Sequence, residues 1–581
     1  MPRTFRLALA QVNPTVGDLE GNTRMVLESI RKAREQGADL VAFPELVVTG
    51  YPPEDLVLKP AFIRDNLKAT QRIVEATQGI AAVFGFVDRQ AQDVFNAAAI
   101  AHAGKLAGVY HKIFLPNYGV FDEDRYFRPG KSCPVFTING VAIGVNICED
   151  IWYAAGPTTV QANAGAELVV NINGSPYHTG KAKFREQMLG TRASDNDLLL
   201  AYVNTVGGQD DLVFDGTSMV FNESGDLIAR AGQFMDDLLV IDLDVEAVFR
   251  QRLRDPRFRK ELPTSLSAIG QPVSVHVSNY EPRAYPPLPK QQVRPLMDPT
   301  GEVYHALVLG TMDYVRKNGF KKVVLGLSGG IDSSLTCSIA VDALGKENVL
   351  GVAMPSRYSS EGSLADARAL ANALGIELWT VPIEPAHAAY EQMLADKFKG
   401  TPPGVAEQNI QARIRGNILM GISNKINWLV LATSNKSESS MGYSTLYGDM
   451  AGGFAVIKDV PKTLVYQLAR WRNAHGVPTS PIPKSTLEKP ASAELKPGQK
   501  TEAELLPFAV LDPVLHAYVE EERSAEEMIA MGFDRAAVER VVRSVDRNEY
   551  KRRQAAPGVK ITPRNFGKDR RMPIVNGYRE F

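Results

Sequence analysis

The sequence predicts an α/β protein of two units, and three observations support this prediction. Apolar, β-branched runs such as residues 323–327 are typical of strands buried on both faces of a sheet. These runs alternate with segments of helical period along most of the chain. Seven prolines between Pro272 and Pro299 interrupt the alternation, which is typical of an extended linker between units.

Composition narrows the class of protein. The 581 residues are 44% hydrophobic and 23% charged with a formal net charge of −1, so no global field would recruit nucleic acid. The three cysteines form no C-x-x-C pair, which argues against a disulfide framework or a thiolate zinc site. The sequence contains neither a signal-peptide pattern nor an 18-residue apolar run. We therefore expect a cytoplasmic protein that binds neither nucleic acid nor membranes.

The first unit is predicted to span residues 1–265. Its pattern indicates helices at residues 19–36 and 63–76. Strands are expected at residues 5–12, 40–43, 80–87, 94–101, 106–110, 141–147, 168–172, 199–203, 218–221 and 238–241. Many strands together with helical layers predict a large α/β sandwich.

Three polar residues follow predicted strands of this unit. Glu45, Lys112 and Cys148 each stand where an apolar run ends, a position that is rigid yet accessible. A thiol attacks a carbonyl as the thiolate, so it needs a base, and an amine can stabilise the resulting oxyanion. Taken singly, such a cysteine is more often a small buried hydrophobe, and such charged residues are more often solvated charges or a structural ion pair.

In chain order, the motifs Phe-Pro-Glu, His-Lys-x-x-Leu-Pro and Ile-Cys-Glu-Asp resemble those of the nitrilase/amidase superfamily over residues 4–245. The resemblance implies a nitrilase-like αββα sandwich that hydrolyses a carboxamide. It makes Glu45 the base, Lys112 the oxyanion stabiliser and Cys148 the nucleophile. In the glutaminase members, the residues near the bound glutamine match Tyr118, Ser175 and Lys181.

The second unit is predicted at residues 301–581, after a Pro-rich linker at 266–300. A helix at residues 302–318 precedes predicted strands at residues 323–327, 349–355, 377–381 and 427–433. Repeated strand–helix units at this spacing predict a doubly wound parallel sheet, with its ligand site at the carboxyl ends of the strands.

The first of these strands runs into Ser-Gly-Gly-Ile-Asp-Ser and then a helix, an arrangement that favours anion binding. A Walker A loop would place lysine here, whereas this loop has Asp332. Glu438 follows a later strand, so both carboxylates are expected at one sheet edge, where Mg²⁺ and phosphate could bind. The alternatives are an ordinary Gly-rich turn and a surface acid.

The loop motif resembles that of the ATP pyrophosphatases. Together with Gln-Ala-Arg-Ile-Arg-Gly, Ala-Thr-Ser-Asn-Lys-Ser-Glu, Tyr-Ser-Thr-Leu-Tyr-Gly-Asp, Lys-Asp-Val-Pro-Lys-Thr and Lys-Arg-Arg-Gln, it resembles the NAD synthetase family in its glutamine-dependent form. This implies an adenine nucleotide α-hydrolase-like second unit with Mg²⁺ on Asp332 and Glu438. It also implies ATP at Gly326, Leu327, Ser328, Gly329, Gly330, Ile331, Asp332, Ser333 and Thr433, and deamido-NAD at Asn409, Glu438 and Lys551.

The expected reaction joins the two units. One would release ammonia from L-glutamine, and the other would adenylate the nicotinate carboxylate of deamido-NAD with ATP and expel pyrophosphate. A sheltered passage for ammonia is physically sensible, because free ammonia is mostly ammonium at pH 7. The resemblance also implies a homo-oligomer. The alternatives are a related glutamine-dependent ATP pyrophosphatase with a different acceptor, and a binding scaffold without activity.

Three parts of the second unit can each be interpreted in two ways. Arg413 and Arg415 could bind phosphate or form structural ion pairs. Residues 485–504 could be a solvated loop, or a lid over ATP as the resemblance suggests. The basic tail at residues 551–581 could cover a nucleotide or partner, or be a solvated end.

Overall fold

The computed structural model describes residues 3–256, 268–289 and 293–581. They form two compact units, Met1–Gln209 with Val213–Met297 and Asp210–Leu212 with Asp298–Phe581. Within the described residues, no helix combines the length and apolarity needed to cross a membrane.

The first unit contains two large sheets. The first, six-stranded, has the order β14 (Asp237–Asp244), β1 (Thr4–Gln11), β2 (Leu40–Ala42), β3 (Ala81–Gln90), β4 (Asp93–His102), β5 (Lys105–His111). The second, seven-stranded, has the order β13 (Leu227–Arg230), β12 (Met219–Phe221), β9 (Leu199–Asn204), β8 (Leu168–Asn173), β7 (Val141–Ile147), β6 (Ser132–Ile138), β15 (Gln271–His276). Strands β10 (Val206–Gln209) and β11 (Leu212–Asp215) pair with each other.

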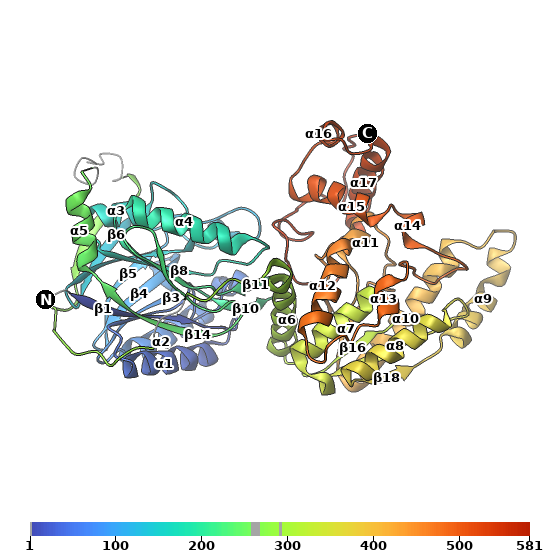
Figure 1. The fold of residues 1–581 in the computed structure, drawn as a ribbon, viewed down its shortest axis with the longest axis horizontal. Helices are drawn as coiled ribbons and strands as arrows, with labels where there is room; N and C mark the ends of the chain where they lie inside the picture. The colour runs from blue at the N-terminus through green and yellow to red at the C-terminus, as the bar shows by residue number, and fades with distance from the viewer. Residues whose placement is uncertain (1–2, 257–267, 290–292) are drawn as a thin grey trace. The chain divides into compact units, whose positions relative to one another are not determined.

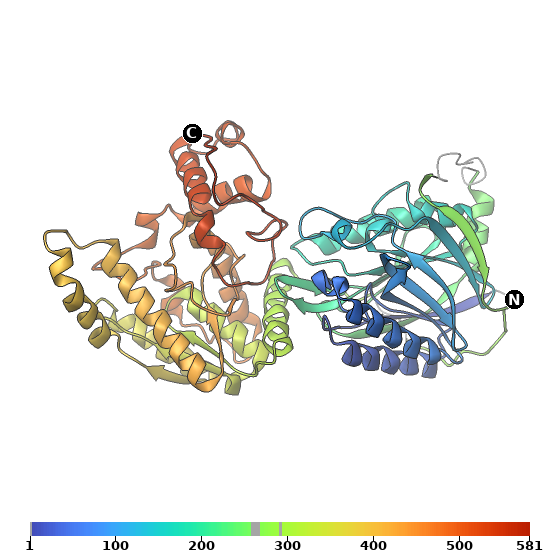
Figure 2. The same ribbon diagram turned by 180° about the vertical axis from the view of Figure 1, so that it is seen from behind.

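Alternation along the strands divides the first unit's core into layers. In β1, Leu7 and Leu9 face the core between the two sheets, whereas Ala8 and Ala10 face the helices outside. Helices α1 (Leu19–Glu35) and α2 (Pro60–Glu75) lie side by side on the first sheet (Figures 1 and 2), while α3 (Pro157–Asn163) and α4 (Lys181–Asp195) cover the second. The predicted αββα sandwich is confirmed.

Strand β15 corrects the predicted linker. The sequence predicts an extended connector at residues 266–300, but Gln271–His276 pairs in parallel with β6 as an edge strand. The prolines obscured this strand, since its exposed, mixed pattern lacks the apolar run of a buried strand. The predicted boundary at residues 265–266 lies outside the described residues. Helix α5 (Glu246–Arg254) precedes it.

The second unit is built on a parallel sheet with the order β18 (Glu377–Thr380), β17 (Val349–Ala353), β16 (Val323–Gly326), β19 (Leu429–Ala432), β20 (Phe454–Ala455). The chain runs outward from β16 to β18, and then returns to place β19 on the other side of β16. Such a reversal creates a crevice at the carboxyl ends of the central strands. The predicted doubly wound sheet is confirmed.

Helices cover both faces of this sheet. Helices α7 (Ile331–Leu344) and α8 (Glu361–Leu374) connect β16 to β18, and α6 (Pro299–Lys317) and α12 (Lys462–His475) pack on α7. On the opposite face, α10 (Val405–Ile426) packs on β16 and β19, as the amber helix of Figure 2 shows, and α9 (Glu384–Phe398) precedes it. Helix α11 (Lys436–Met441) follows β19 directly.

A helical subdomain completes the second unit (Figure 1). Its core of leucine, valine and methionine side chains joins α15 (Phe508–Leu515), α16 (Ala525–Ala530) and α17 (Arg535–Arg547). Three further short α-helices of this unit are α13 (Lys484–Glu488), α14 (Thr501–Glu504) and α18 (Glu549–Arg552).

Candidate active sites

Glu45 stands just after β2, fully buried, and its carboxylate binds three donors. Oε1 accepts hydrogen bonds from Lys112 Nζ at 2.8 Å and Asn96 Nδ2 at 2.7 Å, and Oε2 accepts from Gly174 N at 2.8 Å. A Cβ atom on Gly85 would lie 2.0 Å from the backbone nitrogen after Glu45, so only glycine lets the turn pack on β3. The scaffold therefore fixes this carboxylate tightly.

Lys112 follows β5 and lies between two carboxylates. Its ammonium also donates to Glu123 Oε1 at 2.8 Å, and its side chain is fully buried. Burial alone would lower the pKa of Lys112, but the charges of Glu123 and Glu45 raise it well above the ordinary value. The two carboxylates thus favour the charged form of Lys112.

Cys148 begins a short 3₁₀ turn, η3 (Cys148–Ile151), at the end of β7. Its φ of +42° is left-handed, a conformation that costs a non-glycine residue about 1–2 kcal/mol. Burial raises the pKa of the thiol well above its ordinary value; the charge of Glu45 adds to this effect and that of Lys112 opposes it. The structure thus brings Glu45, Lys112 and Cys148 together, with a neutral thiol at rest.

Glu123 is a member of this cluster that the sequence did not reveal. It accepts hydrogen bonds from Lys112, from Tyr51 Oη at 2.9 Å and from Asn96 Nδ2 at 3.3 Å. Burial raises its pKa to about 7, although Lys112 opposes the shift. In sequence, Glu-Asp-Arg in a loop looks like a solvated turn, so no pattern distinguishes it.

The three predicted glutamine contacts lie around the same cluster. Tyr118 Oη donates to both oxygens of Glu149, at 3.0 and 2.9 Å, and the charge of Lys181 also acts on that carboxylate. Ser175 follows Gly174, the residue that binds Glu45, and its backbone N–H donates to Asn204 at 2.9 Å. Glu149, the neighbour of Cys148, thus binds Tyr118 and interacts electrostatically with Lys181.

The second site is a cavity of about 320 Å³ at the carboxyl ends of β16 and β19. Of the predicted ATP-binding residues, those lining it are Gly326, Leu327, Ser328, Gly330, Ile331, Asp332, Ser333 and Thr433. Gly329 packs against α8 instead: its φ is +75°, and a Cβ atom there would lie 2.1 Å from the carbonyl oxygen of Ser363. Only glycine fits this turn between strand and helix.

Asp332 and Glu438 face the cavity and share one lysine. Lys462 Nζ donates to Asp332 Oδ2, and to Glu438 Oε1 at 2.9 Å. Asn435 donates to Asp332 Oδ1 at 3.0 Å and caps α11 by accepting from the backbone N–H of Glu438 at 2.9 Å. The sequence motifs contained Lys462 and Asn435, but nothing in them indicated this pairing.

The predicted deamido-NAD contacts divide into two groups. Glu438 lines the cavity. Asn409 and Lys551 instead bind the turn after α11: Asn409 Oδ1 accepts from Thr445 Oγ1 at 2.7 Å, and Lys551 Nζ donates to the carbonyl oxygen of Ser444 at 2.9 Å. Since Ser444 and Thr445 line the cavity, these two residues support its wall.

The two arginines of α10 differ. Arg415 lines the cavity, and its Nε donates to the carbonyl oxygen of Met354 at 3.0 Å. Burial lowers the pKa of Arg415 to about 10, which the charge of Glu494 opposes. Arg413 donates to the carbonyl oxygen of Leu446 at 3.2 Å and is exposed.

Residues 489–495 line another side of the cavity. Glu494 accepts hydrogen bonds from Ser360 Oγ and Ser363 Oγ, both at 2.8 Å, at the amino end of α8. Lys489 forms an ion pair with Asp366 of the same helix at 2.9 Å. This segment is therefore attached to α8 beside the phosphate loop.

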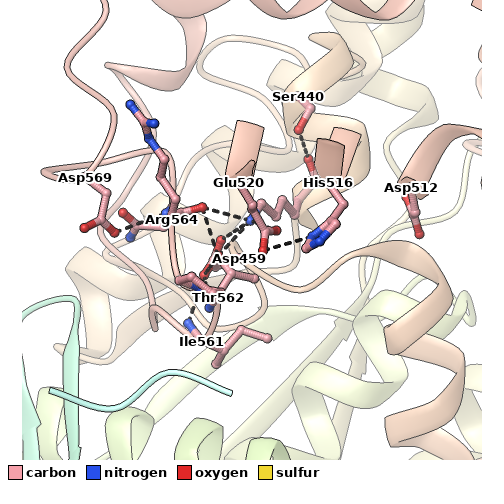
Figure 3. Close-up of polar contacts among 12 residues, drawn as sticks. Ser440, Asp459, Asp512, His516, Glu520, Ile561, Thr562, Arg564 and Asp569 are labelled. Carbon is pink, nitrogen blue, oxygen red and sulfur yellow. Dashed lines mark hydrogen bonds and ion pairs between the residues drawn. The ribbon is translucent and has the colours of Figure 1, made fainter. Parts of the chain in front are cut away.

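A buried polar cluster surrounds Lys436, the first residue of α11 (Figure 3). Lys436 Nζ donates to Glu520 Oε1 at 2.8 Å and to Thr562 Oγ1 at 2.8 Å, and pairs with Asp459 at 3.0 Å. Figure 3 shows Asp459, Glu520 and Thr562 converging, with Asp459 also accepting from the backbone N–H of Ile561. Within the tail, Lys560 pairs with Asp569 at 2.8 Å. Residues 560–562 and Asp569 of the basic tail are thus held by contacts within the second unit.

Two protein families match the two units of the chain. Residues 6–252 match the carbon-nitrogen hydrolase family, and residues 303–555 match the NAD synthase family. The chain therefore joins a carbon-nitrogen hydrolase unit to an NAD synthase unit.

Whole-length relatives identify the particular family. The glutamine-dependent NAD(+) synthetase of Thermotoga maritima is 48% identical over 583 residues, covering 100% of both chains, and that of Aquifex aeolicus is 48% identical, covering 99% of this chain and 100% of the relative. A solved glutamine-dependent NAD+ synthetase from Acinetobacter baumannii, in complex with ADP, is 41% identical with a TM-score of 0.74 and 100% of both chains covered. The chain belongs to the glutamine-dependent NAD(+) synthetases.

Proposed function

We propose that this chain makes NAD from deamido-NAD, using ATP and ammonia taken from L-glutamine. The observation that carries the proposal is that one chain holds both a buried Glu–Lys–Cys cluster and a phosphate-type loop beside two carboxylates. Whole-length relatives that carry the corresponding name support the choice of substrates.

In the first unit, Glu45 takes the proton of the Cys148 thiol as the sulfur attacks the glutamine carboxamide. Lys112, held at 2.8 Å from Glu45, stabilises the oxyanion that forms. Glu45 returns its proton to nitrogen as the C–N bond breaks, and ammonia leaves a thioester on Cys148. Glu45 then deprotonates a water that attacks the thioester, and this proton passes to sulfur as the C–S bond breaks, which releases glutamate and restores the thiol. Tyr118, Ser175 and Lys181 are proposed to hold the glutamine.

In the second unit, the loop at residues 326–333 with Thr433 is proposed to hold ATP in the cavity. The nicotinate carboxylate attacks the α-phosphorus, and the P–O bond to pyrophosphate breaks. Ammonia then attacks the acyl adenylate and expels AMP. Asn409, Glu438 and Lys551 are proposed to position deamido-NAD. Glu438 would do so from the cavity edge, and Lys551 through the turn at residues 442–445, which it binds at the carbonyl oxygen of Gly442.

Asp332 and Glu438 fit a role as magnesium ligands, because their carboxylates already share one cation, Lys462. Within residues 3–256, 268–289 and 293–581, no group of three or more His, Cys, Asp or Glu side chains could hold a metal ion. A magnesium ion here would take these two carboxylates and complete its shell with substrate phosphate oxygens and water. Bound there, it would neutralise phosphate charge.

The decisive experiment measures NAD formation from ATP and deamido-NAD, with glutamine or with ammonium as the nitrogen source. Cys148→Ala should lose glutamine-dependent synthesis by at least about a thousandfold and keep ammonia-dependent synthesis. Cys133→Ala, which removes another buried cysteine of the same unit, should keep both. Loss of both activities in folded Cys148→Ala would contradict the two-site proposal.

A different acceptor is the nearest alternative. Pyrophosphate release should require deamido-NAD, and a larger rate with another carboxylate would assign the chain to a related amidotransferase. We also propose a homo-oligomer, which sedimentation of the full chain would test.

A further inference from the structure

Asp150 lies two residues after Cys148 and joins the two strand ends that carry Lys112 and Cys148. We propose that Asp150 is a positioning residue for glutamine hydrolysis, setting the distance between oxyanion stabiliser and nucleophile. The inference rests on the proposed glutaminase activity of the first unit.

One carboxylate oxygen serves the Lys112 segment. Asp150 Oδ1 accepts hydrogen bonds from the backbone N–H of Ile113 at 3.2 Å and of Phe114 at 2.9 Å. These are the two residues after Lys112, where β5 has ended and its backbone donors need new partners. Their position therefore depends on Asp150.

The other oxygen serves the Cys148 segment. Asp150 Oδ2 accepts from the backbone N–H of Ile147 at 3.1 Å, directly before Cys148, and from Tyr110 Oη at 2.7 Å. The first of these bonds closes the turn in which Cys148 takes its left-handed φ of +42°. A strained backbone of this kind persists only where its surroundings hold it.

An ionised carboxylate is required for this double role. Asp150 is fully buried, and burial raises its pKa to about 6, while hydrogen bonds from Phe114 and Tyr110 oppose the shift. At neutral pH it is therefore ionised and has acceptors on both oxygens. An asparagine of the same shape accepts only through its one carbonyl oxygen. In either amide orientation, an NH₂ group would face a backbone N–H of one of the two segments.

Asp39 offers a matched control in the same unit. It is also buried, and its Oδ2 accepts from the backbone N–H of Arg6 and from Tyr285 Oη, both at 2.7 Å. It precedes β2, whereas Glu45 follows that strand, and it contacts none of the three proposed catalytic residues in the described structure. Asp39→Asn should therefore lower stability without moving Lys112 or Cys148.

The test measures glutamine hydrolysis, ammonia-dependent NAD synthesis and the rate of Cys148 alkylation by iodoacetamide in the full chain. Asp150→Asn should lower kcat for glutamine about a hundredfold with KM changed less than about threefold, because misplaced groups fail mainly in the transition state. Alkylation should slow in parallel, and ammonia-dependent synthesis should persist. Asp39→Asn should change none of the three rates by more than about twofold.

Tyr110→Phe gives a second variant that keeps the carboxylate and removes one of its donors. Its kcat should fall about tenfold, as expected for one hydrogen bond to a charged group. This smaller effect provides a test even if Asp150→Asn does not fold.

Equal kcat in wild type and folded Asp150→Asn, or an equal loss in Asp39→Asn, would overturn the inference. A rise in KM for glutamine with kcat unchanged would also overturn it. If the wild type hydrolyses no glutamine, the proposed function fails instead, and slower alkylation in Asp150→Asn than in Asp39→Asn would still support the positioning role.

Discussion

Each of the two sites contains a buried lysine between two carboxylates, but their surroundings differ. In the first unit, Lys112 lies between Glu45 and Glu123, and all three side chains are almost fully buried. In the second, Lys462 lies between Asp332 and Glu438, whose side chains are each 20% exposed and open onto the cavity. The same grouping is sealed in one site and accessible in the other.

This difference indicates two uses of one arrangement. Burial of the two carboxylates keeps ions from solution away from them, so the first site can hold a fixed pattern of charge for proton transfer at Cys148. Where the carboxylates reach a cavity, a second cation or a phosphate can compete for them and for the lysine. The first site is thus suited to reaction at an uncharged group such as a carboxamide, and the second to binding charged groups.

The largest effect that separates the sites is expected for Asp332→Asn. Losing this carboxylate should lower NAD synthesis about a thousandfold with either nitrogen source and leave glutamine hydrolysis within about twofold. Asp342→Asn is a matched control at the far end of α7, where Asp342 pairs with Arg472. Parallel loss of glutamine hydrolysis in Asp332→Asn would break the comparison.

Lys436→Met tests whether the buried polar cluster around Lys436 stabilises the unit that contains the open site. The change leaves the carboxylates of Asp459 and Glu520 buried without their cation, so the unfolding free energy should fall by about 3 kcal/mol. A denaturant titration, with ammonia-dependent NAD synthesis as the signal of the folded state, measures this free energy. Lys484→Met, in an exposed pair with Glu488, should cost less than about 0.5 kcal/mol. Equal effects would show that the cluster is dispensable.

The sealed site should also have a pH signature. Because burial raises the pKa of Glu123 to about 7, the folded chain holds more protons than the unfolded chain between about pH 4.3 and 7. The Glu123 contribution to stability is therefore largest below this window and is lost as pH rises through it. Relative to Glu123→Gln, the wild-type melting temperature should fall across the window. A rise in melting temperature would mean that Lys112 lowers the pKa of Glu123 by more than burial raises it.

The smallest effect concerns residues 489–495, which line the cavity of the open site. Glu494→Ala removes the bonds to Ser360 and Ser363 and should speed limited proteolysis of the segment about fivefold. Glu488→Ala, nearby and exposed, should leave the rate unchanged. ATP with deamido-NAD should slow cleavage in the wild type. No change on adding both would exclude a lid.

Sequence reasoning predicted the parts of both sites that follow strands. Glu45, Lys112, Cys148 and the loop at residues 326–333 stand where apolar runs end, and such runs are visible in sequence. Glu123 and Lys462 were missed because they stand in a loop turn and at a helix start, and only packing brings them to Lys112 and Glu438. Only the folded chain shows which buried charges share one partner.

Strand β15 bears on how the first unit can be isolated. A chain shortened at residue 265 would lack Gln271–His276 and leave the backbone donors and acceptors of β6 unpaired along one edge. Exposed edges of this kind pair with other molecules and promote aggregation. A chain that ends after Met297 keeps this edge covered. The Pro-rich segment is therefore needed to keep the first unit soluble when that unit is isolated.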